Sequence, residues 1–345
     1  MIFSNLKLLS ISTTLDKYDP QGMHKIYDRW PELARQFFEM NLTTVDFKNI
    51  DHIIFTGMGG SGAIGDTLAA ILSKTNIHLS IVKGYHIPNT ADSNTLVIAT
   101  SASGDTLETL TVLDNANEKG CKIIGFSSGG KMEKYCTKNK IEFRKIPILN
   151  SPRASFPVYL YSILNVLEPL IPIKKNDIME SISILEKTHK KISSSNLTKT
   201  NPSVDLAKWM HGIPMIYYPM GLQAAAIRFK NSLQENAKTH AIAEDIIEAC
   251  HNGIVSWERR SNVQPILIQG KDDYVKTKTL WKVIKEYFDT NKIDYREVHS
   301  VTGTVLSKII NLVYILDYAS IYYAILNKIN PTPIKSIDFV KKRLR

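Results

Sequence analysis

The segment IIFTGMGGSGAIGDTLAAIL, residues 53–72, decides the fold of the first half of this chain. An apolar run is followed by a turn of Gly and Ser and then by an amphipathic run, which predicts a buried strand that ends where a helix begins. VIATSASGDTLETLTVL at 97–113 repeats this pattern. The first turn of a helix presents unpaired N–H groups and the positive end of the helix dipole. Two such turns from one sheet therefore predict a phosphate pocket.

A dinucleotide site is the first alternative, because Gly57, Gly59 and Gly62 satisfy the pattern G-x-G-x-x-G. That site also requires an acidic residue about 20 residues further on, at the end of the next strand. The next strand, IHLSIVKGY, ends in Lys, Gly and Tyr at 83–85. A Gly-Lys-Ser/Thr ending, which a Walker-type loop needs, is also absent from this turn. The turns therefore do not indicate a nucleotide.

Both turns carry hydroxyl groups, which is their most distinctive feature. Uncharged donors of this kind suit the phosphate of a small sugar ester. The predicted phosphate-binding residues are Gly59, Gly60, Ser61, Ser101, Ser103 and Thr106. The alternative is a pair of ordinary strand-to-helix turns in which Ser acts as a helix cap.

Composition places the chain among globular proteins. Its 345 residues are enough for two domains, and 43% are apolar and 22% charged. The formal charge is +10, but apart from KKRLR at the C-terminus the basic residues are scattered. This favours anionic small molecules over nucleic acid, which would call for a basic stripe with aromatics. Three cysteines without C-x-x-C spacing indicate neither a disulfide framework nor a zinc site, so we expect a cytoplasmic protein.

Two apolar segments could be mistaken for targeting or membrane elements. The first fifteen residues carry Lys7 and several Ser without a small-residue cleavage pattern, so they make a poor signal peptide. The most apolar long stretch, 309–326, is interrupted by Asp317 and Ser320. We expect a core helix there and no association with a membrane.

The order of elements predicts an α/β fold of two similar domains. Residues 20–41 form a helical lead-in with one apolar face, and strands and helices alternate over 51–150. A second alternation begins at 213, with a helix to about 236, more helix to 250, a helix at 275–290 and a long helix to about 327. Each domain should be a mostly parallel sheet flanked by helices, a flavodoxin-like αβα sandwich. The expected parts are an N-terminal phosphate-binding domain at 1–152, connecting helices and a linker at 153–204, and a C-terminal domain at 205–345 that ends in helix.

An internal repeat supports this division. TGMGGSG at 56–62 falls in register with YPMGLQA at 218–224. The positions of Gly60 and Ser61 are Leu and Gln in the second copy, which would crowd a phosphate and remove the hydroxyl. We therefore expect the first domain to hold the anion and the second to supply other groups.

Four residues outside the turns are candidates for chemistry. Glu235, near the end of the helix that follows the second-copy turn, gains nothing from the helix dipole, which suits a general base. His251 is able to transfer protons near neutral pH. Arg153 lies in the proline-stiffened loop SPRASFP, and Lys308 heads the helix that carries Asp317. For each, an ordinary surface or structural role is the alternative.

Taken in order, GMGGSG, SASGDTLET at 101–109, SPRASFP, QENAK and LVYILDYASIYYAILNKINPTPIKSID resemble the bifunctional phosphoglucose/phosphomannose isomerases of archaea and bacteria. The resemblance covers roughly residues 20–342. That family belongs to the phosphoglucose isomerase superfamily and is built from two sugar-isomerase (SIS) domains. Combined, these motifs are more specific than the SIS turns alone.

The resemblance implies an aldose–ketose isomerase that acts on glucose, fructose and mannose 6-phosphates through a cis-enediolate. The phosphate would lie on the two Gly/Ser turns. Glu235 matches the family's base, Arg153 matches the arginine that stabilises the enediolate, and His251 and Lys308 match the pair that opens the sugar ring. In the family the histidine comes from the partner subunit, which implies a homodimer. No metal and no organic cofactor is implied.

Two departures and three rivals remain open at this stage. Asp105 places a charge near the phosphate unless it points away, and 299–305 lies where the family tunes acceptance of the mannose epimer. The rivals are a non-catalytic sugar-phosphate-binding SIS protein, another SIS sugar-phosphate isomerase, and a SIS amidotransferase half. An amidotransferase would carry an N-terminal cysteine nucleophile, whereas residue 2 is Ile.

Overall fold

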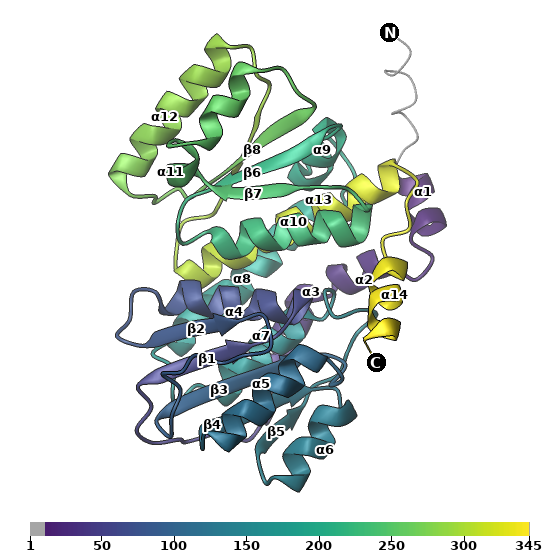
Figure 1. The fold of residues 1–345 in the computed structure, drawn as a ribbon. Helices are drawn as coiled ribbons and strands as arrows, with labels where there is room; N and C mark the ends of the chain where they lie inside the picture. Colours follow the sequence, from purple (N-terminus) through teal and green to yellow (C-terminus); the bar gives the residue numbers. More distant parts are fainter. Residues whose placement is uncertain (1–10, 345) are drawn as a thin grey trace. The chain divides into compact units, whose positions relative to one another are not determined.

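A computed structural model describes residues 11–344 of the chain, and the side chains from residue 14. The chain divides into two compact units. We call Arg29–Leu185 with Gly303–Ile309 the sheet A unit. The sheet B unit is Glu186–Thr302 together with the described residues of 1–28 and 310–345. Each is built around one parallel sheet, as expected for an α/β chain with two domains of this type (Figure 1).

The sheet A unit contains a five-stranded parallel sheet in the order β2-β1-β3-β4-β5. Its strands are β1 (His52–Thr56), β2 (His78–Val82), β3 (Thr95–Ser101), β4 (Lys122–Ser127) and β5 (Glu142–Lys145). Every residue of β1 and β3 is buried, as a parallel sheet covered on both faces requires. This strand order is the flavodoxin-like one, so the predicted fold class is confirmed.

Helices cover both faces of sheet A (Figure 1). They are α3 (Trp30–Glu39), α4 (Gly59–Leu72), α5 (Leu107–Glu118), α6 (Gly130–Lys138) and α7 (Phe156–Val166), and α8 (Lys175–Ile192) starts in this unit. On one face, α5 and α6 bury Val112, Leu113 and Met132 against the apolar residues of β1, β3 and β4. The lead-in helix α3 buries Trp30 and Phe37, as its apolar spacing predicts.

The sheet B unit contains a four-stranded parallel sheet in the order β7-β6-β8-β9. Its strands are β6 (Ile213–Tyr218), β7 (Ile242–Asp245), β8 (Val263–Gln269) and β9 (Arg296–His299). Its helices are α1 (Ile11–Tyr18), α2 (Met23–Asp28), α9 (Pro202–Trp209), α10 (Gln223–Ala237), α11 (Ile246–Ala249), the 3-10 helix η2 (Gly253–Glu258), α12 (Val275–Thr290), most of α13 (Val305–Leu326) and α14 (Lys335–Arg343). In Figure 1, α12 covers one face of this sheet, and α10 and α13 lie on the other.

One element prediction is wrong. Residues 237–250 were expected to be helical throughout, but the chain enters β7 at Ile242 and becomes helical again only in the single turn of α11. The sequence IAED contains good helix formers and lacks the apolar run of a central strand. What makes it a strand is parallel pairing with β6, where Met215 lies opposite Ile242. Such pairing between distant segments overrides local propensity.

Helix α13 is long and apolar enough to cross a membrane by length and composition, and no other helix among residues 11–344 meets that test. In the structure, 89% of its most apolar window is buried within the protein. The same helix carries Asp317, which is fully buried and paired with Arg228. These features are those of the core helix that the interrupted apolar stretch predicts.

Candidate active site

The two glycine-and-hydroxyl turns lie side by side at the carboxyl edge of sheet A. Strands β1 and β3 are hydrogen-bonded neighbours, with Thr56 opposite Ala99. From β1 the sheet continues outward to β2, and from β3 it continues in the other direction to β4. The crevice at such a reversal of strand order is where open α/β sheets bind ligands. The fold therefore brings both predicted turns to the edge at which open α/β sheets bind ligands.

The first turn leads directly into α4. Gly57 must lack a side chain, because a Cβ there would lie 2.9 Å from the carbonyl oxygen of Thr100. Gly59 has φ +53°, and a Cβ there would meet no described atom within 4 Å, so the surface above it is open. Ser61 is buried in the first turn of the helix. This arrangement keeps the start of α4 accessible to an anion.

The second turn is held by its own hydroxyl groups. Ser101 Oγ donates to Thr106 Oγ1 at 2.9 Å and accepts from the Gly104 N–H at 3.1 Å. Thr106 is the N-cap of α5, yet its side chain makes no capping bond to that helix. Ser103 is exposed. The turn therefore presents oriented hydroxyl groups beside the first turn.

The carboxylate of Asp105 is bound at the start of α6. Its Oδ1 accepts from the backbone N–H of Lys131, at 3.0 Å, in the first turn of α6. The positive end of the α6 dipole stabilises a carboxylate at this place. Asp105 therefore has a partner of its own at the start of α6.

Arg153 lies next to the first turn. A Cβ at Gly60 would lie 3.2 Å from the backbone nitrogen of Arg153, so Gly60 permits the close approach of the two segments. Trp30 holds the loop that carries Arg153, because its Nε1 donates a hydrogen bond to the Ala154 carbonyl at 2.9 Å. The Arg153 side chain is 3% exposed. The sheet A unit therefore assembles both turns and this arginine.

Glu235 belongs to the sheet B unit and occupies the last turn of α10, as predicted. Its side chain is half-buried. The helix ends at Lys238, which has φ +54° and whose Nζ donates to the Glu235 carbonyl at 2.7 Å. A lysine that caps the last carbonyls offsets the negative end of the dipole around this carboxylate.

His251 and Lys308 occupy different settings. His251 is exposed and lies two residues after the end of α11, with its N–H bonded to the Glu248 carbonyl at 2.9 Å. Lys308 is half-buried in the first turn of α13 and belongs to the sheet A unit. The residue before that helix, Thr304, caps it by accepting from the Ser307 N–H at 3.2 Å. Within 299–305, Thr304 is therefore engaged in helix capping.

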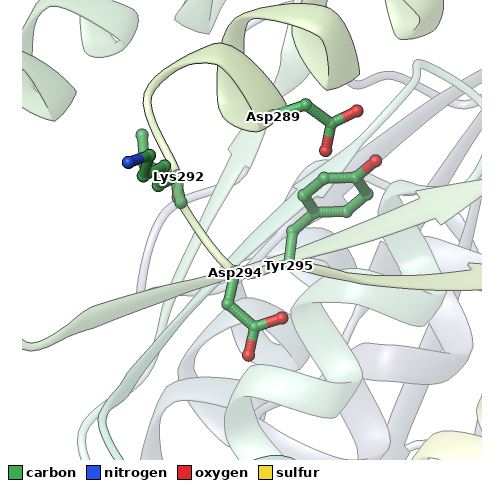
Figure 2. Close-up of a pocket in the computed structure, with 5 residues that line it drawn as sticks. Asp289, Lys292, Asp294 and Tyr295 are labelled. Carbon is green, nitrogen blue, oxygen red and sulfur yellow. The ribbon is translucent and has the colours of Figure 1, made fainter.

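A pocket elsewhere does not coincide with these residues. It lies where α12 ends and β9 begins, lined by Asp289, Lys292, Ile293, Asp294 and Tyr295 (Figure 2). This is the amino end of a parallel strand, whereas ligands of open α/β sheets bind at the carboxyl ends. Burial and the neighbouring Asp289 raise the pKa of Tyr295, so its phenol stays protonated at neutral pH. None of the predicted site residues lines this pocket.

Sequence reasoning missed one feature of α10. On its buried face Arg228, Ser232 and Asn236 follow one another at four-residue spacing and bond to Asp317 and Ser320 of α13. The signal was present in QAAAIRFKNSLQENA as polar residues at i, i+4 and i+8, but that spacing is equally typical of a solvated face. The partner that makes it a buried face lies about 90 residues away in the chain.

Comparison with known proteins agrees with this architecture. The family model described as SIS domain matches residues 46–145, and the one described as bacterial phospho-glucose isomerase C-terminal SIS domain matches residues 199–344. Among solved structures, a hypothetical protein from Thermus thermophilus superimposes with a TM-score of 0.70 at 15% identity, covering 98% of this chain and 94% of that one. The C-terminal domain of glucosamine-fructose-6-phosphate aminotransferase from Francisella tularensis gives 0.66 at 15% identity, covering 88% and 95%. These likenesses show the fold.

Curated relatives extend the match along most of the chain. A bifunctional phosphoglucose/phosphomannose isomerase from Caldicellulosiruptor bescii is 29% identical over 91% of this chain and 96% of the relative. One of the same description from Aquifex aeolicus is 26% identical over 89% and 95%. A D-glucosamine-6-phosphate 4-epimerase from Sulfolobus acidocaldarius is 30% identical over 71% and 77%.

The chain contains two SIS-type sheets, and in the first of them the two hydroxyl-bearing turns form a cradle where the strand order reverses. These features define a two-domain sugar-isomerase protein. Within that class, the chain belongs to the bifunctional phosphoglucose/phosphomannose isomerase family. The resemblance seen in the sequence is confirmed.

Proposed function

We propose that this protein is an enzyme that interconverts glucose 6-phosphate and fructose 6-phosphate, and also mannose 6-phosphate and fructose 6-phosphate. The observation that carries the proposal is the cradle in the sheet A unit, where the turns after β1 and β3 meet and Arg153 adjoins Gly60. Membership in a family of sugar-phosphate isomerases supports it. We further propose that the enzyme works in the cytoplasm without a metal or organic cofactor.

The phosphate is the anchor of the substrate. It binds to the start of α4 and to the hydroxyl groups of the second turn, at Gly59, Gly60, Ser61, Ser101, Ser103 and Thr106. Backbone N–H groups and the helix dipole neutralise its charge, so no lysine is needed for it. Binding energy from this unreactive end positions the reacting carbons.

Proton transfer is assigned to Glu235. Starting from the open-chain aldose, its carboxylate takes the proton from C2 while the electron pair forms the C1–C2 double bond of the enediolate. The same carboxyl group returns the proton to C1, and a second proton moves from O2 to O1, which gives the ketose with no net change in atoms or electrons. Arg153 stabilises the negative oxygens of the intermediate.

Ring opening is assigned to His251 and Lys308, which exchange protons with the ring oxygen and the anomeric hydroxyl group. His251 is exposed in its own subunit, which suits a residue contributed to the site of a partner in a homodimer. Mannose 6-phosphate shares the route because the enediolate is planar at C2. Return of the proton to the opposite face of C2 gives the epimer.

The test is a coupled assay of the purified protein on fructose 6-phosphate that measures glucose 6-phosphate and mannose 6-phosphate separately. Both products are expected. Glu235→Gln is expected to lower kcat by roughly 10²–10⁴-fold, while sugar phosphate still binds, measured by calorimetry. Near-normal turnover by that variant would refute the base assignment. Tight binding by the wild type without either product would indicate a non-catalytic sugar-phosphate-binding protein.

The relative from Sulfolobus acidocaldarius motivates a second substrate in the same assay, since its description is that of an amino-sugar 4-epimerase. Glucosamine 6-phosphate is therefore incubated with the enzyme, and formation of the C4 epimer is followed by chromatography. We expect no epimer, because C2 chemistry needs no hydrogen transfer at C4. Formation of the epimer at a rate above that of isomerisation would favour the second function.

A further inference from the structure

A ladder of buried polar contacts joins α10 to α13 within the sheet B unit. Arg228 donates to Asp317 Oδ2 through Nε at 3.0 Å and through a terminal nitrogen at 2.6 Å. Ser232 Oγ donates to Asp317 Oδ1 at 2.7 Å, and Asn236 Nδ2 donates to Ser320 Oγ at 2.8 Å. All five side chains are at most 3% exposed. We call these five residues the α10–α13 ladder.

Stability alone does not account for the charged pair in this ladder. Removing two charges from water costs about as much as their attraction returns, and apolar residues of similar volume are often as stable. Apolar surfaces also slide and rotate over one another, whereas hydrogen bonds with fixed directions allow one arrangement. Tyr27 adds a further directional contact, since its hydroxyl donates to Asp317 Oδ2 at 3.0 Å. The ladder therefore defines the rotation of α10 about its own axis.

That rotation decides where Glu235 lies. Glu235 follows Ser232 by three residues and precedes Asn236 by one, so it is about 60° around the helix from Ser232. A carboxylate about 6 Å from the helix axis would move by about 2 Å if the helix turned by about 20°. A misplacement of about 1 Å is enough to cost a reaction about 10²-fold.

The charge of Glu235 also acts on the ladder. Burial opposes the charge on Arg228, but Asp317, Tyr27 and Glu235 together raise the pKa of Arg228 above its usual value. Glu235 therefore lies within electrostatic reach of the guanidinium group. Asp317 offsets that positive charge at close range, and the base faces a compensated pair instead of an isolated cation.

We propose that the α10–α13 ladder, with Arg228 and Asp317 at its centre, is a set of positioning residues that hold Glu235 in register for proton transfer. The inference rests on the proposed function, in which Glu235 is the base. None of the ladder residues needs to touch the substrate. Their effect on the reaction passes through the orientation of α10.

The test uses readouts that do not depend on how much of the protein is folded. One is the ratio of glucose 6-phosphate to mannose 6-phosphate formed from fructose 6-phosphate. The other is the primary isotope effect on kcat with glucose 6-phosphate that carries deuterium at C2. Arg228→Met is expected to lower kcat by roughly 10–100-fold with KM changed by less than about 2-fold. It should also raise the isotope effect and shift the ratio.

Milder variants keep the test decisive if Arg228→Met does not fold. Ser232→Ala removes one contact and should shift the same readouts less, and Arg228→Lys, which keeps the charge, should restore much of the activity. The matched control is Thr188→Val, which removes a buried bond of the same kind on α13, from Asn311 Nδ2 to Thr188 Oγ1 at 2.9 Å. It is expected to lower stability without changing either readout.

Two results would contradict the proposal in distinguishable ways. If Ser232→Ala and Arg228→Met keep the product ratio and the isotope effect of the wild type, the ladder is purely structural. The proposed function would then still stand. A wild-type protein that makes neither product would overturn the proposed function, and this inference with it.

Discussion

The turn that joins β1 to α4 and the turn that joins β6 to α10 are two versions of one design. Each follows an interior strand that is second from one edge of its sheet, and each has a glycine at positive φ, Gly59 at +53° and Gly221 at +96°. After that glycine they diverge. The first continues with Gly60 and Ser61, whereas the second continues with Leu222, which is 6% exposed, and Gln.

This difference shows how two similar strand–turn–helix units can take different roles. Small residues leave the amino end of α4 open for a phosphate, while a buried leucine closes the equivalent place before α10. The second helix instead carries its candidate catalytic residue at the opposite end, where Glu235 lies between two members of the α10–α13 ladder in sequence, Ser232 and Asn236. The expected division of labour is therefore binding in the sheet A unit and proton transfer by a residue of the sheet B unit.

The largest effect should come from making the first turn resemble the second. Gly60→Leu places a side chain where a Cβ would already lie 3.2–3.3 Å from the backbone of Arg153 and Pro152. We expect KM for fructose 6-phosphate to rise by roughly 10²-fold, as expected for the loss of a charge-assisted phosphate contact. Steady-state kinetics measure this, and circular dichroism verifies the fold. An unchanged KM would remove the first turn from the phosphate site.

The reciprocal change should affect stability instead of binding. Leu222→Ala empties buried space at the start of α10, and we expect a loss of about 2–3 kcal/mol in the free energy of unfolding. Chemical denaturation measures the loss. KM should stay within about 2-fold of the wild type, since this turn is not expected to bind the phosphate. A large increase in KM at normal stability would show that both turns contribute to binding.

A smaller effect is expected at Asp105, in the second turn of the sheet A unit. Because its carboxylate accepts from the Lys131 N–H at the start of α6, Asp105→Ala should cost about 1 kcal/mol of stability, like the loss of a helix cap. Because we do not expect the Asp105 carboxylate to repel the phosphate, its removal should hardly change KM. If KM instead fell several-fold, the carboxylate would have to turn toward the phosphate in solution.

The smallest effect concerns pH. Burial, assisted by His78 and opposed by Asp51 and Asp92, lowers the pKa of His52 at the start of β1 below 6.5. The unfolded chain therefore binds a proton more readily than the folded one, so this contribution to stability is complete above pH 6.5 and is lost as the pH falls through the folded pKa.

The corresponding strand of sheet B, β6, begins with Ile213 and Pro214, which do not titrate. His52→Gln should accordingly flatten the dependence of the melting temperature on pH between 5 and 7 by a small amount, measured by thermal unfolding in matched buffers. Because His78 contributes to the lowered pKa of His52, His78→Gln should flatten the slope in the same direction but by less. An identical slope in wild type and His52→Gln would assign the acid sensitivity to other groups.

Much of the candidate site could be placed in the fold from the sequence, because its parts are local. The turns at 57–62 and 101–106 are each defined by a few consecutive residues, and a parallel sheet must bring the carboxyl ends of neighbouring strands to one edge. The position of Glu235 in the last turn of α10 followed from helix length alone. The strand β7 was missed, because a short edge strand depends on a partner that lies elsewhere in the chain.

The sequence by itself determined the class of the fold and the two Gly/Ser turns of the sheet A unit. It also determined the difference between the turn before α4 and the turn before α10. Strand-to-helix turns and apolar periodicity are encoded within short segments, which is why these features could be predicted. Tertiary structure alone decided three other features: the approach of Arg153 to Gly60, the orientation of Asp105 toward α6, and the burial of Arg228 against Asp317. Each of these depends on which surfaces meet after the chain has folded. Local patterns cannot specify that choice, since a polar residue at helical spacing looks the same whether its partner is water or a buried carboxylate.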